Sequence, residues 1–192
     1  MSRVKKKIKE YSYDDCWMYI LLLTTLVIFM EALKSYTFKI DGVNLTYSLL
    51  LMPLMYFIVN FITKKYDYKK SIAAIAISGV IFVCFIALMS FTLGEKLMLG
   101  NISGEFCAYI VSQFINLTLY LFLIDNTDSP FILIILNYMF AFIVYYLFYT
   151  LIYLNAINLD SYWTGYFITL GIQFIICIPI VYFDIRIKRR GK

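Results

Sequence analysis

The sequence contains no histidine, and only three prolines and eight glycines occur in its 192 residues. Without histidine, the chain lacks the commonest proton relay and the commonest metal ligand of proteins. Its four cysteines, Cys16, Cys84, Cys107 and Cys177, form no C-x-x-C pair and lie in or beside apolar segments. We interpret them as packing residues and expect neither a disulfide framework nor a metal site.

Motifs of catalysis and of nucleotide binding are also missing. The chain has no G-x-x-x-x-G-K-[ST] loop, so this motif provides no ATP site with which it could drive transport. No pair of carboxylates, and no nucleophile beside a base, occurs in an arrangement that supports catalysis. We therefore expect no enzymatic activity, no catalytic residue and no cofactor.

Apolar residues, by contrast, are abundant. They make up 62% of the chain, charged residues only 15%, and the mean hydropathy is +0.81. A soluble domain of this size could not bury so much apolar surface. Six apolar runs, at residues 16–33, 45–63, 71–93, 106–124, 131–154 and 162–183, are each long enough to cross a bilayer as a helix. The sequence predicts an all-α integral membrane protein, a single transmembrane domain over residues 1–192 built as a bundle of six transmembrane helices.

The basic residues predict the orientation of this bundle. If the N-terminus lies inside, fourteen of the seventeen Lys and Arg residues fall on the inner side and three, Lys34, Lys39 and Lys96, fall outside. The positive-inside rule then places both termini in the cytoplasm. Because the basic groups flank the apolar runs, they indicate topology and not nucleic-acid binding. The abundance of Lys, Ile, Tyr, Phe and Asn is typical of an AT-rich bacterial genome, so we expect a multi-pass protein of a bacterial plasma membrane.

Polar and small residues recur every four positions in four of the apolar runs. The fourth run has Gly104, Ala108, Ser112 and Asn116, with Gln113 beside them. In lipid, such residues belong against other helices or a wet cavity. The stripes of the second, fifth and sixth runs are Ser48, Met52, Tyr56 and Asn60; Asn137, Ala141, Tyr145, Tyr149 and Tyr153; and Gly165, Thr169, Gln173 and Cys177. Four such stripes predict a bundle with a polar interior.

The amides and two of the tyrosines on these stripes are candidate contacts for a small solute. Asn116 and Gln173 lie near the middle of their runs, where an amide either bonds across helices or meets a ligand. The alternative is an interhelical Asn–Gln bridge that holds the bundle together and binds nothing. For the tyrosines, stacking on a flat heterocycle stands against simple packing. The candidate solute-binding residues are Asn60, Gln113, Asn116, Asn137, Tyr145, Tyr149 and Gln173.

Two stretches of the chain resemble a known family. The first, LKSYTFKIDGVNLTYSLLLMPLMYFIVNFITKKYDYKK, covers residues 33–70; the second, AYIVSQFINLTLYLF, covers residues 108–122 and is followed by YYLFYTLIY and QFIICIPIVYF. They contain P-x-x-Y at Pro53–Tyr56 and at Pro179–Tyr182, and A-x-x-x-S-Q from Ala108 to Gln113. In order and spacing these motifs resemble the VUT family of vitamin-uptake-like membrane proteins, which includes the queuosine-precursor transporters.

The chain departs from that family at polar positions. Family members carry an acid where this chain has Asn60 and Asn116, and a lysine where it has Gln173. The E-x-Y-G motif of the second loop becomes the sequence KKYD at residues 64–67. The charged groups of the family pocket are thus replaced by neutral ones, so proton coupling through those acids is not expected.

Two classes of function follow. The resemblance implies a transporter or a substrate-capture (S-component-like) subunit for a small flat heterocycle, such as a 7-deazaguanine queuosine precursor or a vitamin-like compound. It would work alone or with a separate energising ATPase module. The alternative is a non-transporting membrane scaffold, or a membrane-acting effector, whose buried amides are structural. The expected partners are the lipid bilayer and the solute, with no nucleic acid.

Overall fold

The computed structural model describes residues 13–33, 36–40, 43–93, 99–126, 129–153 and 159–190. In this part of the chain six α-helices follow one another: α1 (Tyr13–Ala32), α2 (Met52–Lys65), α3 (Tyr68–Leu93), α4 (Leu99–Asn126), α5 (Pro130–Tyr153) and α6 (Leu159–Arg190). Each overlaps one of the six apolar runs, so the prediction of six helices is confirmed. By length and composition, segments Tyr68–Thr92 of α3 and Gly104–Leu123 of α4 could each cross a membrane.

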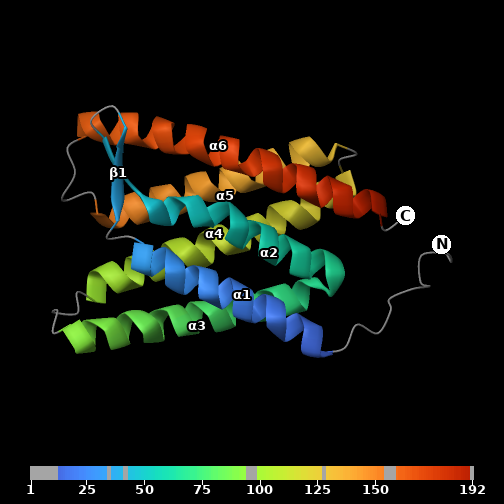
Figure 1. Cartoon of the computed structure of the whole chain (residues 1–192), viewed down its shortest axis with the longest axis horizontal. Coiled ribbons are helices and arrows are strands. Elements are labelled where there is room, and N and C mark those ends of the chain that lie inside the picture. The colour runs from blue at the N-terminus through green and yellow to red at the C-terminus, as the bar shows by residue number, and fades with distance from the viewer. Residues whose placement is uncertain are drawn as a thin grey trace.

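The helices form one bundle with alternating directions. α4 and α5 make the most extensive pairing; α3 packs against α1 and α4, and α6 packs against α5 and α2. α2 lies in the middle and contacts α1, α3, α4, α5 and α6. Figure 1 shows that α1 begins and α6 ends at the same end of the bundle. This arrangement brings the predicted polar stripes of α2, α4 and α5 together.

The second predicted span, 45–63, differs from the structure at its start. Leu45 and Thr46 belong to strand β2 (Val43–Thr46), which pairs antiparallel with β1 (Thr37–Ile40). A short 3₁₀ helix, η2 (Tyr47–Leu51), then leads into α2. At about 1.5 Å per residue for α2 and about 2 Å for η2, the two together rise about 31 Å, close to the thickness of a hydrocarbon core. The hairpin lies at the end of the bundle opposite the α2–α3 turn (Figure 1).

Local signals explain where α2 and α3 begin. Pro53 stands in the first turn of α2, where its missing N–H leaves no intrahelical bond unmade. The side chain of Asp67 caps α3, since its Oδ1 accepts a hydrogen bond of 2.8 Å from the backbone N–H of Lys70. The two helices are therefore separated by a turn of only two residues, and they pack against each other.

The interface between α3 and α4 is close and contains a hydrogen-bonded pair of hydroxyls. Gly79 faces α4 so tightly that a Cβ there would lie 2.9 Å from Cδ1 of Ile110 and 3.1 Å from Cε2 of Phe106. Directly beside this contact, the hydroxyls of Ser78 and Tyr109 are 2.7 Å apart, and both residues are buried. Ser78 also donates toward its own helix, at Ala74 O and Ile75 O. A small residue thus lets α3 and α4 approach, and one hydroxyl pair ties them together.

The outside of the bundle is apolar, and its interior carries many polar groups. Large apolar side chains are exposed on all six described α-helices, for example Leu21 on α1, Leu54 on α2, Phe91 on α3, Phe122 on α4, Leu136 on α5 and Ile175 on α6. The buried polar residues of the described chain include five amides besides serines and threonines. Exposed apolar surface of this extent is rare on soluble monomers.

Candidate functional site

The four predicted stripes point to the interior. Every stripe residue whose side chain the structure describes is buried: Gly104, Ala108, Ser112, Asn116 and Gln113; Ser48, Met52, Tyr56 and Asn60; Asn137, Ala141 and Tyr145; Thr169, Gln173 and Cys177. The side chains of Tyr149, Tyr153 and Gly165 lie outside the described residues. The prediction of a bundle with a polar interior is confirmed for the described positions.

Three asparagines from three helices meet at the centre of this interior. Asn60 of α2 and Asn116 of α4 exchange two hydrogen bonds, with Nδ2 to Oδ1 distances of 3.2 and 3.1 Å. Asn137 of α5 donates from its Nδ2 to the same Asn116 Oδ1, at 2.8 Å. The Nδ2 of Asn116 also lies 3.5 Å from the backbone oxygen of Tyr56. We call Asn60, Asn116 and Asn137 the asparagine triad; it links α2, α4 and α5.

The hydrogen bonds of the triad differ from the interhelical Asn–Gln bridge that the sequence suggested. An Asn–Gln bridge between α4 and α6 was the alternative to a binding site, but the partners of Asn116 are Asn60, Asn137 and the Tyr56 backbone. Gln173 is buried on α6, which packs against α5 and α2. The structure therefore brings three of the predicted amides, Asn60, Asn116 and Asn137, into hydrogen-bonding contact. Gln173 of α6 is buried but is not a partner of Asn116.

In and beside the triad, polar atoms remain without partners among the described residues. Gln113 is fully buried, and among the described residues neither its Oε1 nor its Nε2 has a hydrogen-bond partner. The same holds, within the described part of the chain, for Oδ1 of Asn137, whereas the buried hydroxyl of Tyr56 interacts with the side chain of Ser112. Burying an amide without a partner costs about 1–3 kcal/mol. Gln113 on α4 and Asn137 on α5 form what we call the unfilled polar layer.

Aromatic rings flank this layer. Tyr56 and Tyr138 are nearly parallel, with ring centroids 6.2 Å apart and an interplanar angle of 20°. Tyr138 was missed by sequence analysis because it stands one residue beyond the stripe residue Asn137. Tyr145, a predicted contact, is buried on the same helix. Buried aromatic rings thus lie within the interior, on Tyr56 and Tyr138 as well as on the predicted Tyr145.

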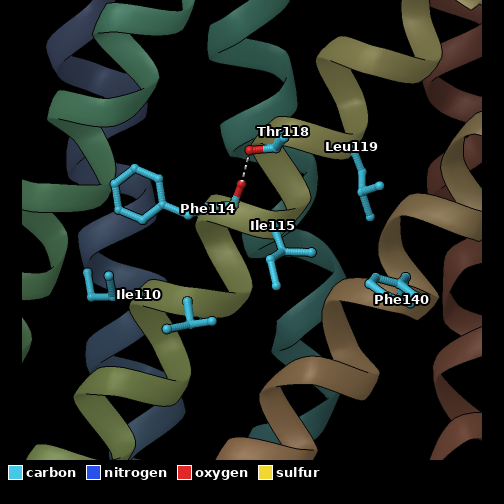
Figure 2. A pocket seen from close by; sticks show the side chains of 7 residues that line it. Ile110, Phe114, Ile115, Thr118, Leu119 and Phe140 are labelled. Atoms are coloured by element: carbon cyan, nitrogen blue, oxygen red, sulfur yellow. Dashed lines mark hydrogen bonds between the residues drawn. The ribbon is translucent and has the colours of Figure 1, made fainter.

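Two grooves described in the structure are apolar and lie elsewhere. One, of about 430 Å³, opens on the outer face of α4 and α5 and is lined by residues such as Ile110, Phe114 and Phe140 (Figure 2). Its one hydroxyl, on Thr118, bonds back to the Phe114 backbone oxygen at 2.9 Å. The other groove, of about 370 Å³, lies between α1 and α3. Neither includes a residue of the asparagine triad or the unfilled polar layer.

The cysteines and acids form no site in the described residues. Cys16 and Cys177 are buried, as packing residues should be, whereas Cys84 and Cys107 are exposed on the apolar surface. Within the described ranges, no group of three or more Cys, Asp and Glu side chains is placed so that it could hold a metal ion.

No family model, curated protein or solved structure matches this chain. The resemblance to the VUT family therefore stands on the motifs themselves, and the structure separates them. Tyr56 of the first P-x-x-Y motif and the A-x-x-x-S-Q residues Ala108, Ser112 and Gln113 are buried in the interior. Tyr182 of the second P-x-x-Y motif is exposed on α6. The motifs of α2 and α4 are thus the ones that belong to the candidate site.

Proposed function

We propose that the chain is a six-span protein of a bacterial plasma membrane, with both termini in the cytoplasm. Three observations support this: apolar side chains exposed on all six described α-helices, polar residues buried inside, and fourteen of seventeen basic residues on one side. The start of α1 and the end of α6 lie at the same end of the bundle, which fits an even number of spans (Figure 1). A membrane-impermeant thiol reagent applied to intact cells should label Lys39→Cys in β1 and spare Asp67→Cys in the α2–α3 turn. The reverse pattern would contradict the orientation.

We propose further that the bundle binds a small, flat, mostly neutral solute, as a transporter or substrate-capture subunit. The observation that carries this proposal is Gln113, a fully buried amide with no described partner for either polar atom. A bundle held by packing alone would be more stable with an apolar residue there. Gln113 has no described partner in the empty fold. A bound solute that hydrogen-bonds to its amide would explain why a polar residue occupies this position.

The polar atoms indicate the chemistry of that solute. Gln113 offers one acceptor oxygen and two donor hydrogens, Asn137 Oδ1 offers an acceptor, and the Tyr56 hydroxyl, which interacts with Ser112, lies beside them. None of the three carries a charge, so a neutral molecule with a donor–acceptor edge suits them best. A 7-deazaguanine or a vitamin-like heterocycle has such an edge and a flat face that could stack on Tyr56 or Tyr138. Binding and translocation, with or without a separate energising ATPase module, require no catalytic turnover.

A second candidate function has an observation of its own. The asparagine triad satisfies most of its own hydrogen bonds, which favours a structural role for these three amides. If the whole interior is structural, the protein is a membrane scaffold or a membrane-acting effector. The two readings differ at the unfilled polar layer, and the test is directed there.

A thermal-shift screen of purines, 7-deazapurines and vitamins on the detergent-purified protein tests the proposal. A solute present at 100 times its dissociation constant stabilises the fold by about 2.7 kcal/mol. Gln113→Met should abolish the shift, whereas Thr118→Val, which changes an outward-facing position on the same helix, should retain it. A panel that leaves the melting temperature of the unmodified protein unchanged would favour the scaffold. Uptake of a hit into proteoliposomes then separates transport from capture.

A further inference from the structure

The turn that joins α2 to α3 concentrates positive charge. Four lysines, Lys64, Lys65, Lys69 and Lys70, occur in residues 64–70 with a single acid, Asp67. Lys64 and Lys69 are exposed, whereas Lys65 and Lys70 are half-buried. Half-buried lysines are held against the protein surface, so these two cations have defined positions at this end of the bundle.

Aromatic side chains fix the Lys65 ammonium. Its Nζ donates to the Tyr19 hydroxyl at 3.4 Å and lies 4.8 Å from the centre of the Tyr19 ring. The rings of Tyr66 and Phe61 are 5.2 and 6.0 Å away. Burial lowers the pKa of Lys65, but its hydrogen bonds to Tyr66 and Tyr19 outweigh that effect and leave the pKa above its usual value. The rings hold the ammonium in position beside the Tyr19 hydroxyl.

Lys70 belongs to the same cationic site, next to the start of α1. The thiol of Cys16 lies within electrostatic reach of Lys70, Lys65 and Asp67. The backbone of Lys70 is fixed by its hydrogen bond to the Asp67 side chain. Two lysines from α2 and α3 therefore flank the first residues of α1.

An apolar groove begins beside this cationic site. It lies between α1 and α3, has a volume of about 370 Å³, and is lined by residues that include Trp17, Leu21, Ile77 and Ile81. The hydroxyl of Thr24, also in the lining, bonds to the Ile20 backbone oxygen at 2.8 Å. The groove thus offers hydrocarbon contacts and no preference for a polar solute.

The spacing along α3 connects the two features. Lys70 and Ile77 are seven residues apart, and Ile81 follows four residues later, so all three lie on nearly the same face of the helix. At about 1.5 Å per residue, Lys70 is about 10 Å from Ile77 along the axis. A lipid whose headgroup lies at the lysines could therefore extend an acyl chain along the groove.

We propose that this end of the bundle binds one anionic phospholipid, with its phosphate on Lys65 and Lys70 and an acyl chain in the α1–α3 groove. The inference rests on the membrane location proposed above and is independent of the solute. A free phosphate would use the lysines but gain nothing from the groove. A zwitterionic lipid would use the groove but gain less from two positioned cations. An anionic lipid alone uses both.

Native mass spectrometry of the full chain in detergent tests the proposal with three probes. These are phosphatidylglycerol, phosphatidylcholine with the same acyl chains, and glycerol 3-phosphate. Phosphatidylglycerol should remain bound at the lowest concentration, and glycerol 3-phosphate should not bind in the same range. Equal binding of the two lipids, or binding of glycerol 3-phosphate as tight as that of phosphatidylglycerol, would overturn the proposal.

Variants separate the two halves of the site. Lys65→Gln with Lys70→Gln should weaken phosphatidylglycerol binding roughly 30-fold, given about 1 kcal/mol for each basic residue near the surface. Lys39→Gln, an exposed lysine at the opposite end of the bundle, is the matched control and should change nothing. Ile77→Trp should weaken binding by filling the groove, whereas Leu136→Trp on α5 should not. Unchanged binding in both site variants, at unchanged melting temperature, would overturn the proposal.

The membrane location is tested first, by measuring whether detergent is required to extract the protein from the cell membrane fraction. If it is extracted without detergent, the proposed function fails together with this inference. If it requires detergent but shows no preference for anionic lipid, the inference fails alone.

Discussion

Helix α4 has two inward-facing interfaces that differ in how their buried polar groups are paired. Toward α3, Gly79 allows close contact and the Ser78 and Tyr109 hydroxyls satisfy each other. Toward α2 and α5, the asparagine triad makes its bonds, but Gln113 beside it has no described partner. In the first interface the two described hydroxyls are both paired. The second contains polar atoms without a described partner, and that excess is what distinguishes a candidate binding site from a helix contact.

Removing the centre of the triad should have the largest effect on stability. Asn116→Leu deletes its bonds to Asn60 and Asn137 and leaves both of those amides buried without it. At about 1–3 kcal/mol for each stranded amide, the loss should be about 3 kcal/mol. Thermal unfolding of the purified variant without solute measures it. A change below about 0.5 kcal/mol would mean that the triad does not hold α2, α4 and α5 together.

Overpacking the α3–α4 interface should come next. Gly79→Leu places a side chain where even a Cβ would lie 2.9 Å from Ile110. Extra methylenes in a close-packed contact cost about 1–3 kcal/mol, and we expect about 2 kcal/mol here. Leu136→Ala, a change at an exposed position on α5, serves as the control for handling in detergent. Normal stability of Gly79→Leu would show that the two helices are not in close contact.

Losing one partner of a satisfied pair should cost less. Tyr109→Phe removes the hydroxyl that meets Ser78, yet Ser78 keeps its bonds to the backbone of its own helix. The expected loss is about 1 kcal/mol, the usual contribution of one buried hydrogen bond. Equilibrium unfolding in denaturing detergent reports it. A loss as large as that of Asn116→Leu would erase the difference between the two interfaces.

The smallest change in stability, and the opposite sign, is expected at Gln113. Gln113→Met replaces a buried amide that lacks a described partner with an apolar side chain of similar size. Stability without solute should stay the same or rise by up to about 1 kcal/mol. Melting temperatures of this variant and of Asn116→Leu, measured side by side, sharpen the comparison most. A clear loss of stability would show that Gln113 is structural.

Sequence patterns predicted the parts of this architecture that depend on periodicity. Six apolar runs gave six helices, and four-residue spacing gave the correct inward faces of α2, α4, α5 and α6 at the described positions. Burial periodicity is a property of one helix, so it can be recognised without knowing its neighbours. The same reasoning placed Asn60, Asn116 and Asn137 in the interior.

The pairing of those residues could not be predicted, because it depends on how helices cross. Asn116 and Gln173 both lie near the middle of their helices, but Asn116 bonds to Asn137 of α5 and not to Gln173 of α6. The β1–β2 hairpin was also missed, since residues Leu45 and Thr46 continue an apolar run without a break. The Asp41-Gly42 dipeptide was the available signal, being a preferred sequence of tight hairpin turns.

The most direct test of the central claim is the melting temperature of Gln113→Met, with and without a panel of purines, 7-deazapurines and vitamins. The account predicts that at least one solute raises the melting temperature of the unmodified protein, and that this shift disappears in a variant whose stability without solute is not reduced. A Gln113→Met protein that melts earlier without solute, or that keeps the full shift, would contradict it.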